Sequence, residues 1–148
     1  MSRIATALLL ALAPLVAACG SASEASPAKP EPAQAAAAGD FQTACMTVMQ
    51  RNRACTAEYI PALVDMRARI DKPAGIKDAV AQDRAGVIAR ANEEWKTDST
   101  DEAFARVCQS VQEHATPEAA EQAKACMAKD TCAEYAPCIT AVMETSMR

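Results

Sequence analysis

Cysteines offer this chain its most distinctive chemistry, and six of the seven lie beyond residue 44. The first two of these, Cys45 and Cys55, fall on one side of a helix predicted over residues 41–55. The segment between them rises by about 15 Å as a helix, whereas the Cα atoms of a disulfide lie within about 7 Å of each other. Cys45 and Cys55 therefore cannot bond to each other, and each needs a later partner. The later cysteines are Cys108, Cys126, Cys132 and Cys138.

The expected order of the helices selects among the many ways of pairing six cysteines. If the helices that begin near Ser99 and Thr116 form a hairpin, Cys108 and Cys126 come within about one turn of each other. An antiparallel arrangement of the first and last helices then pairs the remaining four. We therefore predict the disulfides Cys45–Cys138, Cys55–Cys132 and Cys108–Cys126. The main alternative pairs Cys55 with Cys126 and Cys108 with Cys132.

Cofactor chemistry would need motifs that the sequence lacks. Haem attachment uses C-x-x-C-H and a thioredoxin-like site uses C-x-x-C, and neither spacing occurs. Methionine sulfur suits Cu(I), but methionine is also a common core residue, and His114 is the only histidine. The methionines in question are Met46, Met49, Met127, Met143 and Met147. We expect no metal or other cofactor, and we place His114 on the surface near a helix end.

Two arginines lie at unexpected positions. Arg67 and Arg84 fall within the apolar faces of two consecutive predicted helices. In the simpler interpretation, their aliphatic stems lie along the core and their charged heads reach water. The alternative is a site for a carboxylate or another anion that the two helices share.

The first twenty residues have the organisation of an export signal. Arg3 supplies a positive charge, and an apolar run over residues 4–16 follows that is short for a membrane span. The run ends in VAACG over residues 16–20. This segment resembles the signal peptide of bacterial lipoproteins, whose lipobox places an aliphatic and two small residues before a cysteine. The resemblance implies removal of residues 1–18 and acylation of Cys19, and Gly20 implies sorting to the outer membrane, facing the periplasm.

The number of cysteines agrees with this resemblance. If Cys19 carries lipid, six cysteines remain for three disulfides, which form and persist in exported proteins. Several acyl chains on one residue would make the membrane anchorage effectively permanent.

The mature chain divides into a tether and one domain. Residues 19–39 hold no large apolar side chain and are rich in alanine, proline and serine, which predicts a disordered spacer. Residues 40–148 have helical periodicity and no β alternation. We predict an all-α domain, a small disulfide-stapled bundle of five or six short helices.

Caps and prolines set the expected helix ends. Ser99 and Thr131 each precede a glutamate by three residues, the spacing of a capping box. Pro61 and Pro137 predict a break, a kink or a fresh start. The expected N-caps are Asp40, Ser99, Thr116 and Thr131.

A thin core makes the disulfides important to stability. Only 24 large apolar residues follow residue 39, and alanine, which is abundant, buries little area. Three disulfides at about 2–4 kcal/mol each would be a large share of a net stability of about 5–15 kcal/mol.

These features predict a lipid-anchored protein of the bacterial cell envelope that acts as a non-catalytic binding or structural module. Its expected partners are the membrane, through the lipid, and an envelope protein. The net charge of −4 and the lack of a basic block argue against nucleic acid. One alternative is a periplasmic carrier of a metal or small molecule, which needs a cavity or converging sulfur atoms. The other is an envelope enzyme, which needs a cleft that gathers His114 with acidic residues.

Overall fold

The fold is all-α throughout the part that the computed structural model describes, which is the backbone over residues 32–148 and the side chains over 40–148. This result confirms the predicted fold class. The helices are α1 (Pro32–Ala54), α2 (Thr56–Ile70), α3 (Ile76–Asp98), α4 (Asp101–Gln112), α5 (Pro117–Met127) and α6 (Cys132–Met147). The expected signal peptide and the lipidated Cys19 lie outside the described residues.

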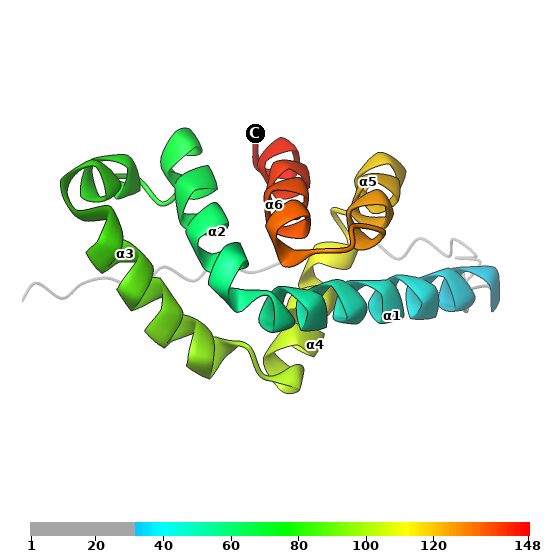
Figure 1. Ribbon diagram of the computed structural model, residues 1–148. Coiled ribbons are helices and arrows are strands. Elements are labelled where there is room, and N and C mark those ends of the chain that lie inside the picture. Colours follow the sequence, from blue (N-terminus) through cyan, green and yellow to red (C-terminus); the bar gives the residue numbers. More distant parts are fainter. Residues whose placement is uncertain (1–31) are drawn as a thin grey trace, which may run out of the picture.

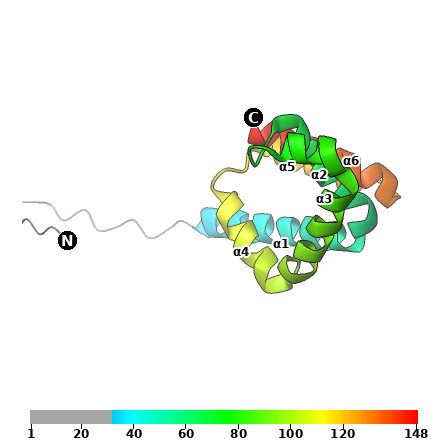
Figure 2. The ribbon, with the colours of Figure 1, turned by 90° about the vertical axis from the view of Figure 1, so that its left-hand side faces the viewer.

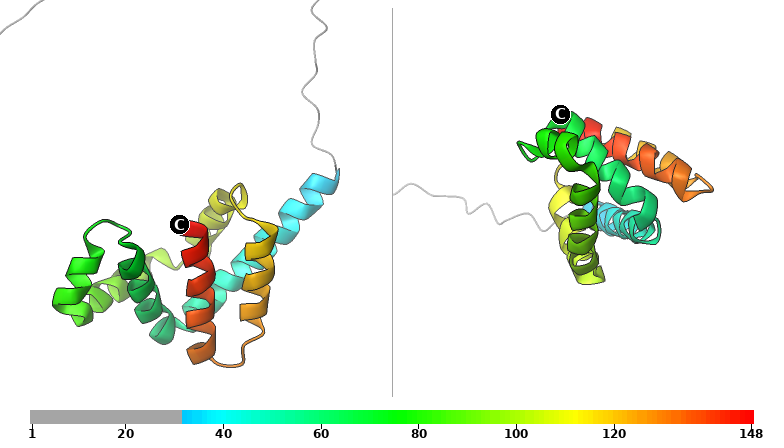
Figure 3. Two further views of the ribbon diagram at one scale, coloured as in Figure 1. Left: turned by 90° about the horizontal axis from the view of Figure 1, so that it is seen from above. Right: turned by 60° about the vertical axis from the view of Figure 1, so that its left-hand side comes forward.

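Four helices form a row on one side of α1, in the order α3, α2, α6 and α5 (Figure 1). Within the row, α2 packs against both α3 and α6, and α6 packs against α5. The remaining helix, α4, lies outside this row, and it crosses α1 and packs on it (Figures 1 and 2). Seen from above, α2 and α6 lie between the outer helices α3 and α5 (Figure 3). The molecule therefore consists of a two-helix base and a four-helix row.

The core lies where α2 and α6 meet near the end of α1. Ile60, Met66 and Tyr135 are almost completely buried there. In contrast, α3 contributes no fully buried residue and packs through half-buried side chains. One of these is Trp95, whose ring lies 5.4 Å from that of Tyr59. Val80, Val87, Ile88 and Ala91 also pack half-buried against the core, so α3 covers one side of α2.

The first helix begins earlier than the sequence analysis predicted. It starts at Pro32, so Asp40 lies inside α1 and does not cap it. Residues 32–39, which we assigned to the tether, belong to this helix. Proline is well suited to the first turn of a helix, and the alanine run that follows has the highest helix propensity of any residue type. A helix can therefore form over these residues although they hold no large apolar side chain.

Neither internal proline breaks or restarts its helix, so that part of the expectation is wrong. The chain turns between α1 and α2 at Cys55, whereas Pro61 lies inside α2 and Pro137 lies inside α6. Each proline removes the hydrogen bond to the carbonyl four residues earlier. Those carbonyls belong to Ala57 and Ala133, which are both exposed. Water can therefore satisfy them, and the helices continue.

Threonine side chains cap the three helices that follow α3. Thr116 accepts a hydrogen bond from the Ala119 N–H, and Thr131 accepts one from the Glu134 N–H, as expected. The cap of α4 is Thr100, not the predicted Ser99. Ser99 is buried, and its carbonyl oxygen accepts a hydrogen bond from α1.

Candidate functional site

Of the three disulfides, one lies within the base, one connects the base to the row, and one closes the row at its α5 edge. The Cα–Cα separations are 5.7, 5.3 and 5.5 Å, within the usual range for disulfides. The bridges are Cys45–Cys108, which joins α1 to α4, Cys55–Cys132, which joins the end of α1 to the start of α6, and Cys126–Cys138, which joins α5 to α6.

The structure has one of the three predicted pairs, Cys55–Cys132. The predicted pairs Cys45–Cys138 and Cys108–Cys126 are wrong, and so is the alternative pairing. Both errors come from one assumption, that α4 and α5 form a hairpin. In the structure α4 packs across α1, which places Cys108 beside Cys45, and α5 instead forms a hairpin with α6.

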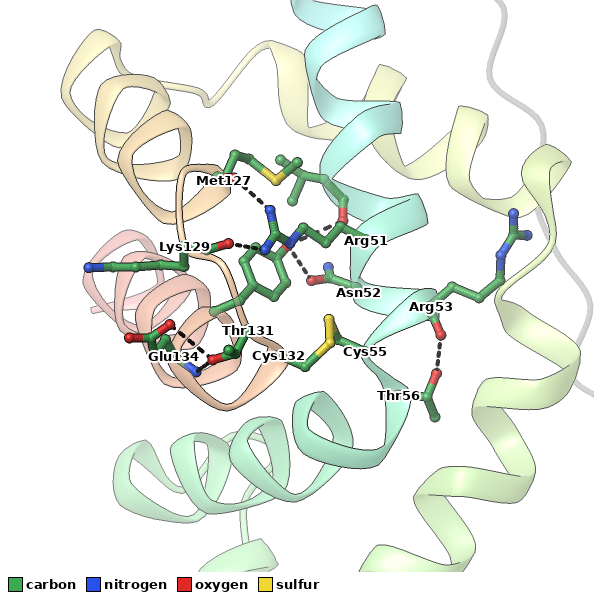
Figure 4. Close-up of a disulfide and its surroundings, with 12 residues drawn as sticks. Arg51, Asn52, Arg53, Cys55, Thr56, Met127, Lys129, Thr131, Cys132 and Glu134 are labelled. Atoms are coloured by element: carbon green, nitrogen blue, oxygen red, sulfur yellow. Dashed lines mark hydrogen bonds between the residues drawn. A yellow bond between two sulfur atoms is a disulfide. The ribbon is translucent and has the colours of Figure 1, made fainter.

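A polar junction surrounds the Cys55–Cys132 disulfide (Figure 4). The Asn52 side chain is 1% exposed, and its Oδ1 accepts a hydrogen bond of 2.8 Å from the Tyr135 hydroxyl. The Arg51 guanidinium donates to the carbonyl oxygens of Met127 and Lys129. The Met127 carbonyl lies at the C-terminal end of α5, where a helix carries partial negative charge, and the Lys129 carbonyl lies just beyond that end. Arg51 thus binds the end of α5 while Asn52 binds α6.

The same junction changes the acidity of its tyrosine. Burial raises the pKa of the Tyr135 hydroxyl well above its usual range, and the nearby Arg51 offsets this effect in part. The Arg51 guanidinium lies 4.6 Å from the centre of the Tyr135 ring, a cation–π contact. The Tyr135 side chain therefore remains a neutral hydrogen-bond donor at ordinary pH.

A second arginine of α1 holds the start of α4. Arg53 donates to the Ser99 carbonyl oxygen at 2.8 Å and forms an ion pair of 2.8 Å with Asp101. Its guanidinium also lies 5.3 Å from the ring centre of Phe104. The sequence analysis assigned no role to Arg51 or Arg53. Their positions directly beside Asn52, on the face next to the cysteines, were the signal that could have found them.

Two of the methionine sulfurs have separate hydrogen-bond partners. Met49 Sδ accepts a hydrogen bond from Asn52, and Met143 Sδ accepts one from the Tyr59 hydroxyl. Burial also raises the pKa of that Tyr59 hydroxyl to about 12, despite the opposing charge of Arg67. No group of three or more His, Cys, Asp or Glu side chains suited to a metal ion occurs in this part of the chain.

His114 is exposed and lies in a surface depression of about 310 Å³ between the ends of α5 and α6. Glu118 also lines this depression, so a histidine and a carboxylate share one hollow. The two hydroxyls contributed by α6 are engaged elsewhere, because Thr145 and Ser146 donate to backbone carbonyls of their own helix. A second depression of similar size continues along the same two helices to the Cys126–Cys138 disulfide.

Arg67 and Arg84 do not form the shared anion site that we considered. Both are exposed, and Arg84 is occupied by Asp65 of α2 in two hydrogen bonds of 2.8 and 2.7 Å. These hydrogen bonds from Arg84 hold the pKa of the Asp65 carboxyl below its usual value. Arg84 therefore reaches across to the neighbouring helix α2, directly after the non-helical residue Asp83 that interrupts α3.

The site and fold together define a class: a small all-α domain whose helices are joined by three disulfides and a buried polar junction. No protein-family model, curated protein or solved structure matches this chain. Among the described helices, none has the length and apolar character needed to cross a membrane.

Proposed function

We propose that this chain is a lipoprotein of the bacterial cell envelope, anchored through Cys19, whose helical domain acts as a non-catalytic binding or structural module. The observation that carries the proposal is the use of the cysteines. Three disulfides account for six of the seven, and the seventh is the cysteine of the lipobox-like segment. Disulfides are typical of exported proteins, so an exported and acylated chain accounts for every cysteine.

The thiol, hydroxyl and polar side chains discussed above already bond within the protein, which favours a binding role over catalysis. Nucleophilic catalysis needs a hydroxyl or thiol within hydrogen-bond reach of a base. The domain cysteines are oxidised in pairs, and the Thr145 and Ser146 hydroxyls beside His114 donate to carbonyls. The polar groups at the junction, Arg51 and Asn52, bind the protein's own backbone and side chains. These contacts hold helices together and leave the outer faces of the row for a partner.

The anchor is tested by expressing the full chain in a bacterial host and measuring the intact mass of the purified protein with and without reductant. We expect a mass increase that fits a cleaved chain acylated at Cys19, and no thiol that an alkylating reagent can label before reduction. The variant Cys19→Ser should lose the acyl groups and the membrane association. The matched control Ser21→Ala keeps the lipobox and should retain both. A mature protein that carries no acyl group, or that shows free thiols, would overturn the proposal.

The binding role is tested by placing a photo-crosslinking residue at exposed positions on different helices in the living cell. Suitable positions are Lys77 on α3, Val111 on α4 and Gln122 on α5, which are all exposed. A binding module predicts one discrete crosslinked envelope protein from one face, with the other positions as internal controls. If no position yields a discrete product, the assignment as a binding module fails, whereas the anchor is judged by its own mass measurement.

A further inference from the structure

The three disulfides differ in how firmly other contacts hold together the helices that they link. Cys45–Cys108 and Cys55–Cys132 connect helices that are also held by the core, Arg53 and the Asn52–Tyr135 contact. Cys126–Cys138 closes a hairpin between residues only 12 apart in sequence. Its stability therefore depends on how firmly α5 stays on α6.

Little besides this disulfide holds α5 in place. The helix has 11 residues, and its only fully buried residue is Cys126 itself. It stands at the edge of the row with α6 as its main packing partner (Figure 1). Its other apolar contacts are few: half-buried Ala119 and Ala123 bury little area, and half-buried Met127 packs against the core at the C-terminal end of the helix. A helix of this length is marginal by itself in water, so after the disulfide opens α5 would be held mainly at that end, by Met127 and the Arg51 bonds.

The Cys126–Cys138 disulfide also borders solvent. Both cysteines line the depression of about 310 Å³ between α5 and α6. The side chains around them are small or uncharged and include Ala125, Ala141 and Val142. An incoming thiolate would therefore meet no carboxylate among the residues that line this depression. Cys138 is half-buried whereas Cys126 is 1% exposed, which makes Cys138 the more accessible sulfur.

We propose that Cys126–Cys138 is a separately reducible disulfide, which a dithiol reductant opens from this depression to release α5 from α6. One thiolate of the reductant attacks Cys138 Sγ, and the bond to Cys126 breaks. Cys126 leaves as a thiolate and takes a proton from water. The second thiol of the reductant, as its thiolate, then attacks the mixed disulfide and frees Cys138, which is protonated in turn. Two electrons pass to the protein, and the reductant becomes a disulfide.

The proposal is tested by titrating the purified full chain with dithiothreitol, alkylating the free thiols and locating them by mass spectrometry. We expect Cys126 and Cys138 to be labelled at a reductant concentration about tenfold lower than the other four domain cysteines, because the native fold brings their sulfurs together less firmly. Hydrogen exchange should accelerate over residues 117–125 at the same point, while the exchange of α1 and α2 stays slow. Simultaneous reduction of all three bridges, or earlier reduction of either other bridge, would overturn the proposal. So would unchanged exchange in α5.

Paired variants separate the release of α5 from general destabilisation. Replacing both cysteines, Cys126→Ala with Cys138→Ala, should accelerate exchange in α5 without any reductant. The matched control, Cys55→Ala with Cys132→Ala, should instead accelerate exchange where α1 meets α6. If the first pair changes exchange across the whole domain as the control does, α5 is not an independent unit. The titration of the unchanged protein remains decisive if either variant fails to fold.

Discussion

Removing one of the two long-range disulfides should cost this domain a large part of its stability. The bridges Cys45–Cys108 and Cys55–Cys132 join residues 63 and 77 apart. While both bridges are intact, however, the entropy cost of opening either one is set by a smaller ring and not by these loops. The shortest covalent path from Cys55 to Cys132 runs back to Cys45, crosses to Cys108 and continues along the chain. It contains roughly 34 residues, and both bridges close this same ring. In the chain-entropy treatment, opening it costs about 3.8 kcal/mol at 25 °C.

The assay is denaturation by urea of the purified full chain, followed by far-UV circular dichroism and by the fluorescence of Trp95, its only tryptophan. The variant Cys55→Ala with Cys132→Ala should lose about 3–4 kcal/mol of unfolding free energy. The matched control, Cys126→Ala with Cys138→Ala, opens a ring of 12 residues and should lose about 2.8 kcal/mol on the same scale. Removing both long-range bridges should cost about 8 kcal/mol, which is comparable to the whole stability of an ordinary domain, and should give an unfolded chain.

The result that refutes this reasoning is a small loss or a reversed order. If the variant without Cys55–Cys132 loses less than about 1 kcal/mol, the disulfide does not restrict the unfolded chain as the entropy treatment requires. If the hairpin variant loses more than the long-range variant, packing at α5 contributes more than its small buried surface indicates.

Three further predictions concern the polar groups. Asn52→Ala and Tyr135→Phe should each cost about 1–3 kcal/mol, because each removes the buried Asn52–Tyr135 hydrogen bond. After Asn52→Ala, the Tyr135 hydroxyl keeps only its 3.3 Å hydrogen bond to the Val48 carbonyl oxygen. Additive losses in a double-mutant cycle would contradict the contact between the two side chains. Burial raises the pKa of Tyr59 to about 12 and raises the pKa of Tyr135 as well. The unfolding free energy should therefore fall as pH rises above 10.0, the usual tyrosine pKa, because the tyrosines of the unfolded chain ionise first. Tyrosinate absorbance from these residues in the folded protein near about pH 10 would contradict this prediction. Hydrogen bonds from Arg84 lower the pKa of Asp65 from 3.8, and hydrogen bonds from Arg148 and Arg69 lower the pKa of Glu144 from 4.5. The two ionised carboxylates therefore stabilise the fold above those values, and this stabilisation is lost as pH falls below them. If an Asp65→Asn, Glu144→Gln variant loses stability in acid as steeply as the unchanged protein, this prediction is refuted.

Local signals in the sequence were sufficient to predict the helices. The apolar spacing around Tyr59 and Leu63 indicates α2, and the threonines at 116 and 131 mark the starts of α5 and α6. These features act within a few residues, so they do not depend on how the helices pack. The prolines did not mark helix ends. A proline is tolerated inside a helix where water can reach the carbonyl that loses its hydrogen bond, and the sequence alone does not show which carbonyls are exposed. The start of α1 failed because alanine supports a helix without needing a core.

The disulfide pairing depended on packing that no local pattern encodes. Cys108 lies on the apolar face of α4, and that face would fit either α1 or α5. In the structure α4 packs on α1, where Arg53 binds the Ser99 carbonyl and Asp101 at the start of α4. The ion pair between Arg84 and Asp65 was missed for a similar reason, since it depends on how α3 packs against α2.

The end of α1 shows how a chain with few large apolar residues keeps its helices in register. Apolar contacts are not directional, so a core with few buried side chains does not by itself fix how its helices lie against one another. Here Arg51 binds the carbonyls that end α5, and Asn52 binds Tyr135 in α6. Such contacts require the helix ends to be held within a fraction of an ångström of their bonding distances. The Cys55–Cys132 disulfide fixes the start of α6 beside the end of α1, so the bridge and the polar junction stabilise the same arrangement and each depends on the other.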